Sequence, residues 1–181
     1  MADLSDEELI NSFKQGNTNQ SFNLLVHKYQ QKLYWHIRHL VIDHDDANDI
    51  TQETFIKAWN NLANFREDAQ LYTWLYRIAT NEALSFLKKK KTRFLVPLIG
   101  NEKYLSEKIE SDSHFSGDDI QKKFQKALIK LPEKQRVVFN LRYYDEMPYE
   151  KMSEILGTST GALKASYHHA VKKIEDFFKT I

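Results

Sequence analysis

The sequence predicts an all-α fold, with two small helical domains joined by a flexible linker. Apolar residues recur at intervals of three and four through most of the chain, the spacing that places them on one face of a helix. Only 5 of the 181 residues are glycine and 3 are proline, so helix interiors are seldom interrupted. The periodicity lapses once, at residues 93–117. We therefore expect a first domain at 1–92, a linker at 93–117 that could include a short helical turn, and a second domain at 118–181.

Four helices are expected in the first domain. The first begins after Ser5, which can cap it while Glu8 completes a capping box. The second carries a long apolar stripe: Phe22, Leu25, Tyr29, Leu33, Ile37 and Leu40. The third follows an acidic segment at 43–49 and is expected to turn five residues inward: Ile50, Phe55, Ile56, Trp59 and Leu62. After a break at 65–70, the fourth is expected to bury Leu71, Trp74, Leu75, Ile78, Phe86 and Leu87.

Pro132 and Gly157 delimit the helices of the second domain. A proline suits the first turn of a helix, so Pro132 separates two helices. A short helix at 147–156 precedes Gly157, which suits a left-handed C-cap, and Ser159 or Thr160 can cap the last helix. The apolar face of that helix is Leu163, Tyr167, Ala170, Val171 and Ile174. This pattern is typical of a DNA-binding helix-turn-helix, although a plain packed helical hairpin fits it equally well.

Charged residues are segregated along the chain, although the net charge is only +1. Residues 1–53 contain 4 Lys/Arg and 9 Asp/Glu, a net of −5, and residues 54–93 contain 8 and 3, a net of +5. Residues 118–181 contain 12 and 9, a net of +3. One acidic block and two basic blocks indicate separate surfaces for separate partners.

Cysteine usage and the N-terminal segment predict the compartment. The chain has no cysteine, which excludes a disulfide scaffold and a thiolate metal site and is consistent with a reducing cytosol. Its N-terminal segment is acidic and amphipathic, unlike a signal peptide, and no apolar run is long enough to span a membrane. We therefore expect a cytoplasmic protein.

The fourth predicted helix has a polar face that ends in a lysine run at 88–91. The face consists of residues spaced by four, four and three: Arg77, Asn81, Ser85 and Lys88. A solvated lysine run that complements the helix dipole is the ordinary explanation. Four lysines at the end of an already basic block instead favour phosphate binding, and an asparagine among cations can read a base edge. Phe65 and Tyr72, beside the preceding loop, could stack on unpaired bases.

Three blocks of the sequence resemble the sigma-70 family of bacterial RNA polymerase sigma factors. They are "DANDITQETFIKAWNNL", "FREDAQLYTWLYRIATNEALSFLKKKK" and "ALIKLPEKQRVVFNLRYYDEMPYEKMSEILGTSTGALKASYHHAVKKI". Their order and separation are similar to those of the extracytoplasmic-function (ECF) type, which keeps only the second and fourth sigma domains. The resemblance covers nearly the whole chain outside the linker.

The resemblance implies a role for each block. The segment at 46–60 would bind the clamp helices of the polymerase β′ subunit, through Asp46, Asp49, Gln52 and Glu53, while Trp59, also on the motif, is expected in the core. The loop and helix of the second block would capture a flipped base and line melted DNA at the minus-ten promoter element. The candidate residues there are Phe65, Arg66, Arg77, Asn81, Ser85 and Lys88. In the minus-thirty-five element, the helix-turn-helix would use Thr160, Lys164, Ser166, His168 and Lys172.

Two departures from the family pattern affect the helix-turn-helix. Pro148 stands where family members usually have serine, so its first helix should survive with a weaker cap. The recognition helix commonly reads Val-Lys-Ser-Arg-Leu-His-Arg-Ala, whereas residues 163–170 read Leu-Lys-Ala-Ser-Tyr-His-His-Ala, without either arginine. Because arginine is the commonest bidentate reader of guanine, we expect a minus-thirty-five preference unlike that of arginine-bearing relatives, more A·T-rich and shape-dependent.

The sequence therefore predicts a binding protein and not an enzyme: an ECF-type sigma factor that binds core RNA polymerase and directs promoter-specific initiation. No cofactor, metal or small-molecule substrate is expected, and the resemblance implies an anti-sigma factor as regulator. One alternative is a stand-alone helix-turn-helix regulator, against which the charge segregation of the first domain argues. A remote alternative is a metal-dependent hydrolase using the histidines and aspartates of residues 36–49, which lack ligand spacing.

Overall fold

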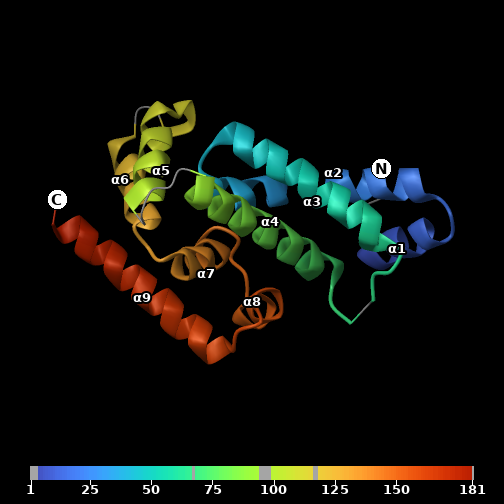
Figure 1. Cartoon of the computed structure of the whole chain (residues 1–181). Helices are drawn as coiled ribbons and strands as arrows, with labels where there is room; N and C mark the ends of the chain where they lie inside the picture. The colour runs from blue at the N-terminus through green and yellow to red at the C-terminus, as the bar shows by residue number, and fades with distance from the viewer. Residues whose placement is uncertain (1–3, 67, 94–98, 116–117, 181) are drawn as a thin grey trace.

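The computed structural model describes residues 4–66, 68–93, 99–115 and 118–180, and these residues form helices and connecting turns (Figure 1). In chain order the elements are α1 (Asp6–Lys14), α2 (Thr18–Val41), α3 (His44–Leu62), α4 (Leu71–Arg93), α5 (Ile99–Ser111), the 3₁₀ turn η1 (Ser113–Phe115), α6 (Asp119–Ile129), α7 (Glu133–Tyr143), α8 (Tyr149–Leu156) and α9 (Thr160–Lys179). The expected all-α fold is confirmed over this part of the chain. Within it, no helix is both long and apolar enough to cross a membrane.

Helices α1 to α4 form a bundle around the apolar stripe of α2. Every predicted member of that stripe is buried, and Leu33 and Ile37 are completely inaccessible to solvent. The predicted capping box is also confirmed. Ser5 Oγ accepts a hydrogen bond from the Glu8 backbone N–H at 3.2 Å, and the Glu8 carboxylate accepts one from the Ser5 N–H at 2.7 Å.

The inward face of α3 differs from the prediction. Ile56 is 54% exposed and Trp59 is 37% exposed, the latter with its edge against Phe13 and Phe22. Each residue of an α-helix turns about 100°, which places Ile56 nearly opposite the centre of the buried face. That face is made instead by residues that include the small Ala47, Thr54 and Ala58. Because the prediction considered only large apolar residues, it misplaced the buried face of α3.

A sharp turn at Ile42 joins α2 to α3. Ile42 has φ 67° and ψ −39°, and the N–H of Asp43 donates to the carbonyl of Val41 at 2.8 Å, which is the geometry of a strained γ-turn. A positive φ is rare for a β-branched residue. The turn persists because Ile42 is 1% exposed and packs with Leu105, Ile109 and Ile129.

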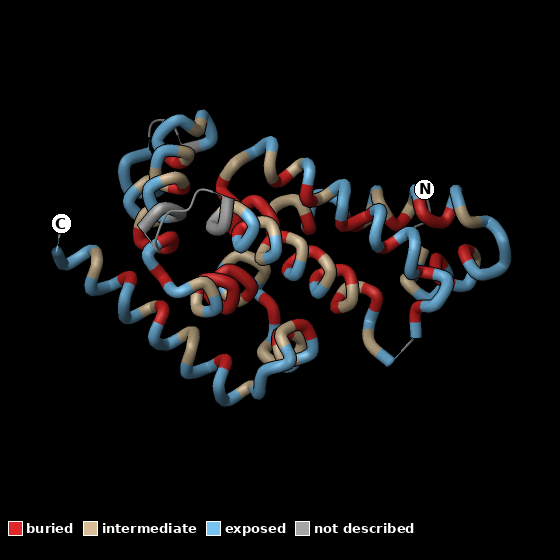
Figure 2. The backbone as a smooth tube through the Cα atoms, viewed as in Figure 1, coloured by how far each residue is buried: buried red, intermediate tan, exposed pale blue. Residues whose placement is uncertain are grey.

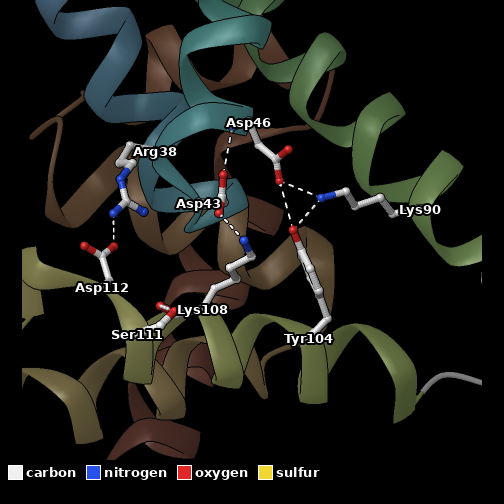
Figure 3. Close-up of polar contacts among 8 residues, drawn as sticks. All are labelled: Arg38, Asp43, Asp46, Lys90, Tyr104, Lys108, Ser111 and Asp112. Carbon is white, nitrogen blue, oxygen red and sulfur yellow. Dashed lines mark hydrogen bonds and ion pairs between the residues drawn. The ribbon is translucent and has the colours of Figure 1, made fainter.

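The predicted linker contains a helix of 13 residues, α5, where the sequence suggested no more than a short helical turn. Leu105 and Ile109 lie four residues apart on one side of α5 and are buried against Ile42 and Ile129. Polar side chains add to this attachment, as Figure 3 shows. Lys108 Nζ lies 2.6 Å from Asp43 Oδ2. The linker helix therefore packs against both domains, on Ile42 of the first and on α6 of the second.

The second domain docks on the first. Figure 1 shows α8 beside α4, with α7 lying between α9 and the first domain. Buried side chains of both domains form one continuous apolar cluster, with Val137, Leu141, Met147 and Met152 from the second domain. The buried stretches that meet at this junction are coloured red in Figure 2. The relative placement of the domains, which the sequence left open, is thus a packed one.

Candidate nucleic-acid interface

One face of α3 carries acidic, amide and apolar side chains that all reach solvent. Asp49, Gln52, Glu53 and Ile56 are exposed, and their spacing of three, one and three places them in one row. A groove beside this row lies between α3 and α2 and includes Tyr34. Negative charge next to an exposed isoleucine suits a basic helix that also offers an apolar contact.

Asp46 is placed differently from those three candidates. Its Oδ2 lies 2.6 Å from Lys90 Nζ and accepts a hydrogen bond from the Tyr104 hydroxyl at 3.1 Å (Figure 3). Although partial burial favours the neutral form of Lys90, its bonds to Asp46 and Tyr104 leave its pKa raised. The carboxylate predicted to contact polymerase is thus engaged within the chain, by α4 and α5.

Asp43, at the N-cap of α3, is occupied in a similar way. Its Oδ1 accepts a hydrogen bond from the Asp46 N–H at 2.9 Å, while Lys108 of α5 pairs with its Oδ2. Partial burial pulls the pKa of Asp43 upward, but these partners outweigh it and the pKa is lowered. Together, Asp43 and Asp46 attach the first turn of α3 to α5.

The predicted basic face of α4 is present. Arg77, Asn81, Ser85 and Lys88 are all exposed along one side of the helix. Its N-terminal half opens onto a hollow of about 640 Å³, which is also lined by the exposed Arg66. The lining therefore combines cations and amides with three acidic residues, Asp68, Glu82 and Glu154, around a space large enough for a nucleobase.

Phe65 does not have the exposed position that stacking on a base requires. Its side chain is 6% exposed, and its ring centroid lies 5.1 Å from that of Trp74. The ring lines the hollow as part of its apolar wall. The prediction of a free stacking platform at Phe65 is therefore corrected, because the loop packs this aromatic ring against α4.

Helix α8 of the docked second domain reaches the same hollow. Arg77 Nη2 donates a hydrogen bond to the backbone carbonyl of Glu154 at 2.5 Å, and Glu154 contributes to the lining. A strand of nucleic acid along α4 would have to displace this contact. The docked arrangement therefore restricts access to the N-terminal half of the basic face.

Helices α8 and α9 have the predicted helix-turn-helix form. Gly157 adopts the left-handed conformation with φ 62°, and Ser159, not Thr160, caps α9 by accepting from the Ala162 N–H at 3.3 Å. Pro148 is the N-cap of α8 and makes no side-chain cap, in agreement with the expected weak start. The turn chemistry read from the sequence is thus confirmed.

The exposed face of α9 contains most of the predicted readers. Lys164, His168 and Lys172 are exposed and Thr160 is half-buried on the same side. Ser166 is half-buried and does not share this face, because the helix turns about 200° between residues 164 and 166. The prediction that Ser166 belongs to this group is therefore corrected, because Ser166 lies on another side of α9.

Sequence reasoning missed two side chains beside Lys164. The ring of Tyr149 has Lys164 Nζ 5.7 Å from its centroid and Arg142 Cζ 5.1 Å from it, both within cation–π range. Arg142 also donates to the Met147 carbonyl at 3.2 Å. The sequence signal that could have identified this cluster is Tyr149, an aromatic residue at the first position of α8, opposite the recognition helix.

The histidines that suggested a metal site are used otherwise. His36 is inaccessible to solvent and its ring bonds to Asp145 and Thr80. His39 stacks on Tyr144 with ring centroids 3.8 Å apart. Over the described ranges, no group of three or more histidines and acidic residues is arranged to hold a metal ion.

Comparison with known proteins agrees with this geometry. The Sigma-70 region 2 family matches residues 25–93, and the Sigma-70, region 4 family matches residues 121–174. The chain is 32% identical to RNA polymerase sigma-H factor of Pseudomonas aeruginosa over 178 residues, covering 94% of this chain and 92% of the relative. It is 30% identical to the ECF RNA polymerase sigma-E factor of Escherichia coli, with coverage of 96% and 94%.

A solved structure has the same fold. It is the sigma factor RpoE in complex with the anti-sigma factor NepR from Bartonella quintana, with a TM-score of 0.67 and 23% identity, covering 88% of this chain and 98% of that one. With two region matches in order and relatives of nearly equal length, the chain belongs to the sigma-70 family of RNA polymerase sigma factors, within its ECF type.

Proposed function

We propose that this chain binds core RNA polymerase and directs it to specific promoters, where it recognises both promoter elements and stabilises melted DNA. The observation that carries this proposal is the arrangement of three surfaces in one sigma-family chain. An acidic face on α3, a basic face on α4 and a helix-turn-helix at α8–α9 are each exposed on a different element. RNA synthesis itself belongs to the polymerase, so the role of this chain is binding.

The α3 face is the proposed polymerase surface. Asp49, Gln52 and Glu53 would pair with a basic helix of the β′ clamp, and Ile56 would add an apolar contact at the centre of that interface. Asp46 can join them only after Lys90 and Tyr104 release its carboxylate. We therefore place Asp46 at the edge of this surface.

The hollow beside α4 is the proposed site for a flipped minus-ten base. Arg66 and Arg77 would neutralise phosphates at its rim, and Asn81 would read the base edge. Ser85 and Lys88 extend the same face along the single strand. Phe65 supports the hollow from beneath, in place of the stacking role expected from the sequence.

The exposed face of α9 is proposed to enter the major groove of the minus-thirty-five element. Thr160, Lys164 and His168 would face the bases, while Lys172 would contact a phosphate. With no arginine on this face, fewer bidentate guanine contacts are available. An A·T-rich, shape-dependent preference follows from this composition.

The docked second domain would have to move before the minus-ten hollow is fully used. Glu154 of α8 occupies one side of that hollow and binds Arg77. If only open molecules bind DNA, the apparent affinity is the intrinsic affinity multiplied by the fraction of molecules that are open. By analogy with the RpoE–NepR complex, we also propose an anti-sigma partner for this chain, and the bacterial cytoplasm as its place of action.

Reconstitution with core RNA polymerase tests the proposal. Purified protein is added to core enzyme, and promoter-selective transcription is run on genomic fragments. Glu53→Gln with Asp49→Asn should weaken binding to core, whereas Glu175→Gln on the far end of α9 serves as a matched control. If no complex with core forms while specific DNA binding persists, the stand-alone regulator is the better description. If neither occurs, the sigma function fails.

A further inference from the structure

A cavity of about 450 Å³, here called the junction cavity, lies where the two domains meet. Its wall includes five aromatic rings and one carboxylate: Trp35 and His39 from α2, Tyr72 and Tyr76 from α4, and Tyr144 and Asp145 from the turn after α7. Helices α2 and α4 belong to the first domain, whereas the turn belongs to the second. The cavity is therefore complete only while the domains are docked.

Contacts between the rings hold this wall in place. His39 and Tyr144 are stacked, with centroids 3.8 Å apart and planes 11° apart. The centroids of Tyr72 and Tyr76 lie 4.7 Å apart. Trp35, Tyr72 and Tyr144 are half-buried, so each keeps part of its ring accessible. Because an aromatic face attracts a cation within about 6 Å of the ring centroid, these rings form a preorganised wall for a positive charge.

Asp145 supplies negative charge to the same cavity. Its side chain is only 12% exposed, its Oδ2 lies 3.1 Å from His36 Nδ1, and its Oδ1 accepts from the Tyr76 hydroxyl at 3.2 Å. Both partners can donate as neutral groups, and within the described part of the chain no lysine or arginine lies within ion-pair distance of this carboxylate. A carboxylate offers about four acceptor positions, so two remain. Since a buried charge without a counter-charge is costly, a cation here would offset that cost.

The ionisable rings of the wall do not supply the missing positive charge. Burial lowers the pKa of His39 to about 4, so its imidazole is neutral at pH 7. Burial, followed by the charge of Asp145, raises the pKa of Tyr72 to about 12, which keeps its hydroxyl neutral as well. Among the described residues of the lining, the cationic one is Lys32, whose side chain is exposed to water. The cavity thus combines uncharged rings with an uncompensated carboxylate.

We propose that the junction cavity binds a small organic cation, an amine or a quaternary ammonium compound, between its aromatic rings and Asp145. Its volume falls within the range of about 300–1,000 Å³ that is usual for small-molecule sites. Ring faces and a carboxylate favour a cation over an uncharged molecule of the same shape. An organic cation is also favoured over a metal ion, because the described residues contain no cluster of histidines and acidic residues arranged to hold one.

The bound cation would also hold the domains together. Its ring contacts come from both domains and Asp145 comes from the second, so it binds the docked form better than the open one and shifts the equilibrium toward docking. In the docked form Arg77 stays bonded to the Glu154 carbonyl. This site does not depend on the proposed function, because neither polymerase nor DNA takes part in it.

Choline and dimethylbutanol, its uncharged carbon isostere, are matched probes for the test. Each is titrated into the full-length chain at an ionic strength kept constant with sodium chloride, and the indole N–H signals of the three tryptophans are followed by nuclear magnetic resonance. The Trp35 signal, assigned from its loss in Trp35→Phe, should shift to saturation with choline, at an affinity about tenfold or more above that for the isostere. Equal affinities, or a choline shift that does not saturate, overturn the proposal.

Three variants test the carboxylate and the rings, with folding checked by circular dichroism. Asp145→Asn should reduce the preference for choline over the isostere by about tenfold or more. Glu146→Gln removes the same charge from the adjacent exposed residue and should leave the preference unchanged. Tyr72→Leu, which removes a ring from the first domain, should lower the preference several-fold. Collapse of the cavity would weaken both probes alike, so a wild-type preference in Asp145→Asn or in Tyr72→Leu overturns the proposal.

Förster transfer measures the expected link to docking. The chain has no cysteine, so Ala63→Cys on the first domain and Glu175→Cys on the second accept dyes specifically, and both positions are exposed. Choline should raise the docked population, whereas the isostere at the same concentration should not. Saturating choline that leaves the docked population unchanged would overturn the placement of the site between the domains. Polymerase and DNA are absent from these assays, so their outcome is separate from that of the proposed function.

Discussion

Leu105→Ala is expected to release α5 from the corner between α2 and α3. Leu105 is 1% exposed and packs with Ile42, Ile109 and Ile129. Buried leucine-to-alanine changes cost about 2–5 kcal/mol, and we take about 2 kcal/mol because this cluster is small and can partly collapse. That energy corresponds to a shift of about 30-fold toward released α5.

Release should change the polymerase surface. Tyr104 would leave Asp46 and Lys108 would leave Asp43, so the first acidic turn of α3 would lose its contacts with α5 while Lys90 of α4 stays paired with Asp46. If the closed α5 limits binding, the apparent affinity for the β′ clamp helices rises, by about 30-fold at most. Isothermal titration with a purified clamp-helix fragment measures the affinity, and hydrogen exchange of the α5 amides measures the release.

Two control variants isolate the cause. Leu105→Met keeps the buried volume and should leave both measurements close to wild type. Tyr104→Phe removes only the hydroxyl that bonds Asp46 and Lys90, so a smaller gain in affinity is expected. If Leu105→Ala speeds exchange in α5 while clamp affinity stays unchanged, the idea that α5 competes with polymerase for Asp46 is refuted.

Four other outcomes are expected. Asn81→Ala should impair promoter opening, measured by permanganate footprinting, more than core binding; equal loss of both would mean a structural role. Glu146→Gly should stabilise the fold by about 1 kcal/mol in urea unfolding, because Glu146 has φ 50° and glycine adopts that conformation without strain; an unchanged midpoint contradicts this. Lys164→Ala should weaken binding to the selected minus-thirty-five site in mobility-shift assays, whereas recovery of a G-rich consensus dependent on α9 would contradict the expected preference. Because burial lowers the pKa of His39 to about 4, neutral His39 contributes fully to stability above about pH 6.5, and the free energy of unfolding declines as pH falls toward 4, by up to about 2 kcal/mol at pH 5. Urea unfolding at pH 7 and at pH 5 should show a smaller loss of unfolding free energy in His39→Gln than in the wild type.

Local patterns predicted much of the fold. The stripe of α2, the capping box at Ser5, the left-handed Gly157 and the cap at Ser159 all depend on neighbours within a few residues. Periodicity located α3 but misjudged Ile56, since it finds large apolar residues and not the small Ala58 that lets helices approach. The sequence therefore predicted which helix carries each of the three surfaces, although it did not predict every side chain on them correctly.

Contacts between distant segments were decided by tertiary structure alone. Among the residues of α5 whose burial is described, Leu105 and Ile109 are the well-buried apolar ones, and they are stable there because Ile42 and Ile129 lie beside them. From the sequence, Asp46 was expected to be a free surface carboxylate, whereas in the fold it accepts a hydrogen bond from the Tyr104 hydroxyl. By itself, the sequence determined the helices and the helix-turn-helix, because those depend on the helical repeat and on nearby caps. Only the folded chain decided the docking of the domains and the contact between His36 and Asp145 at their junction, because these two residues lie 109 positions apart in the sequence.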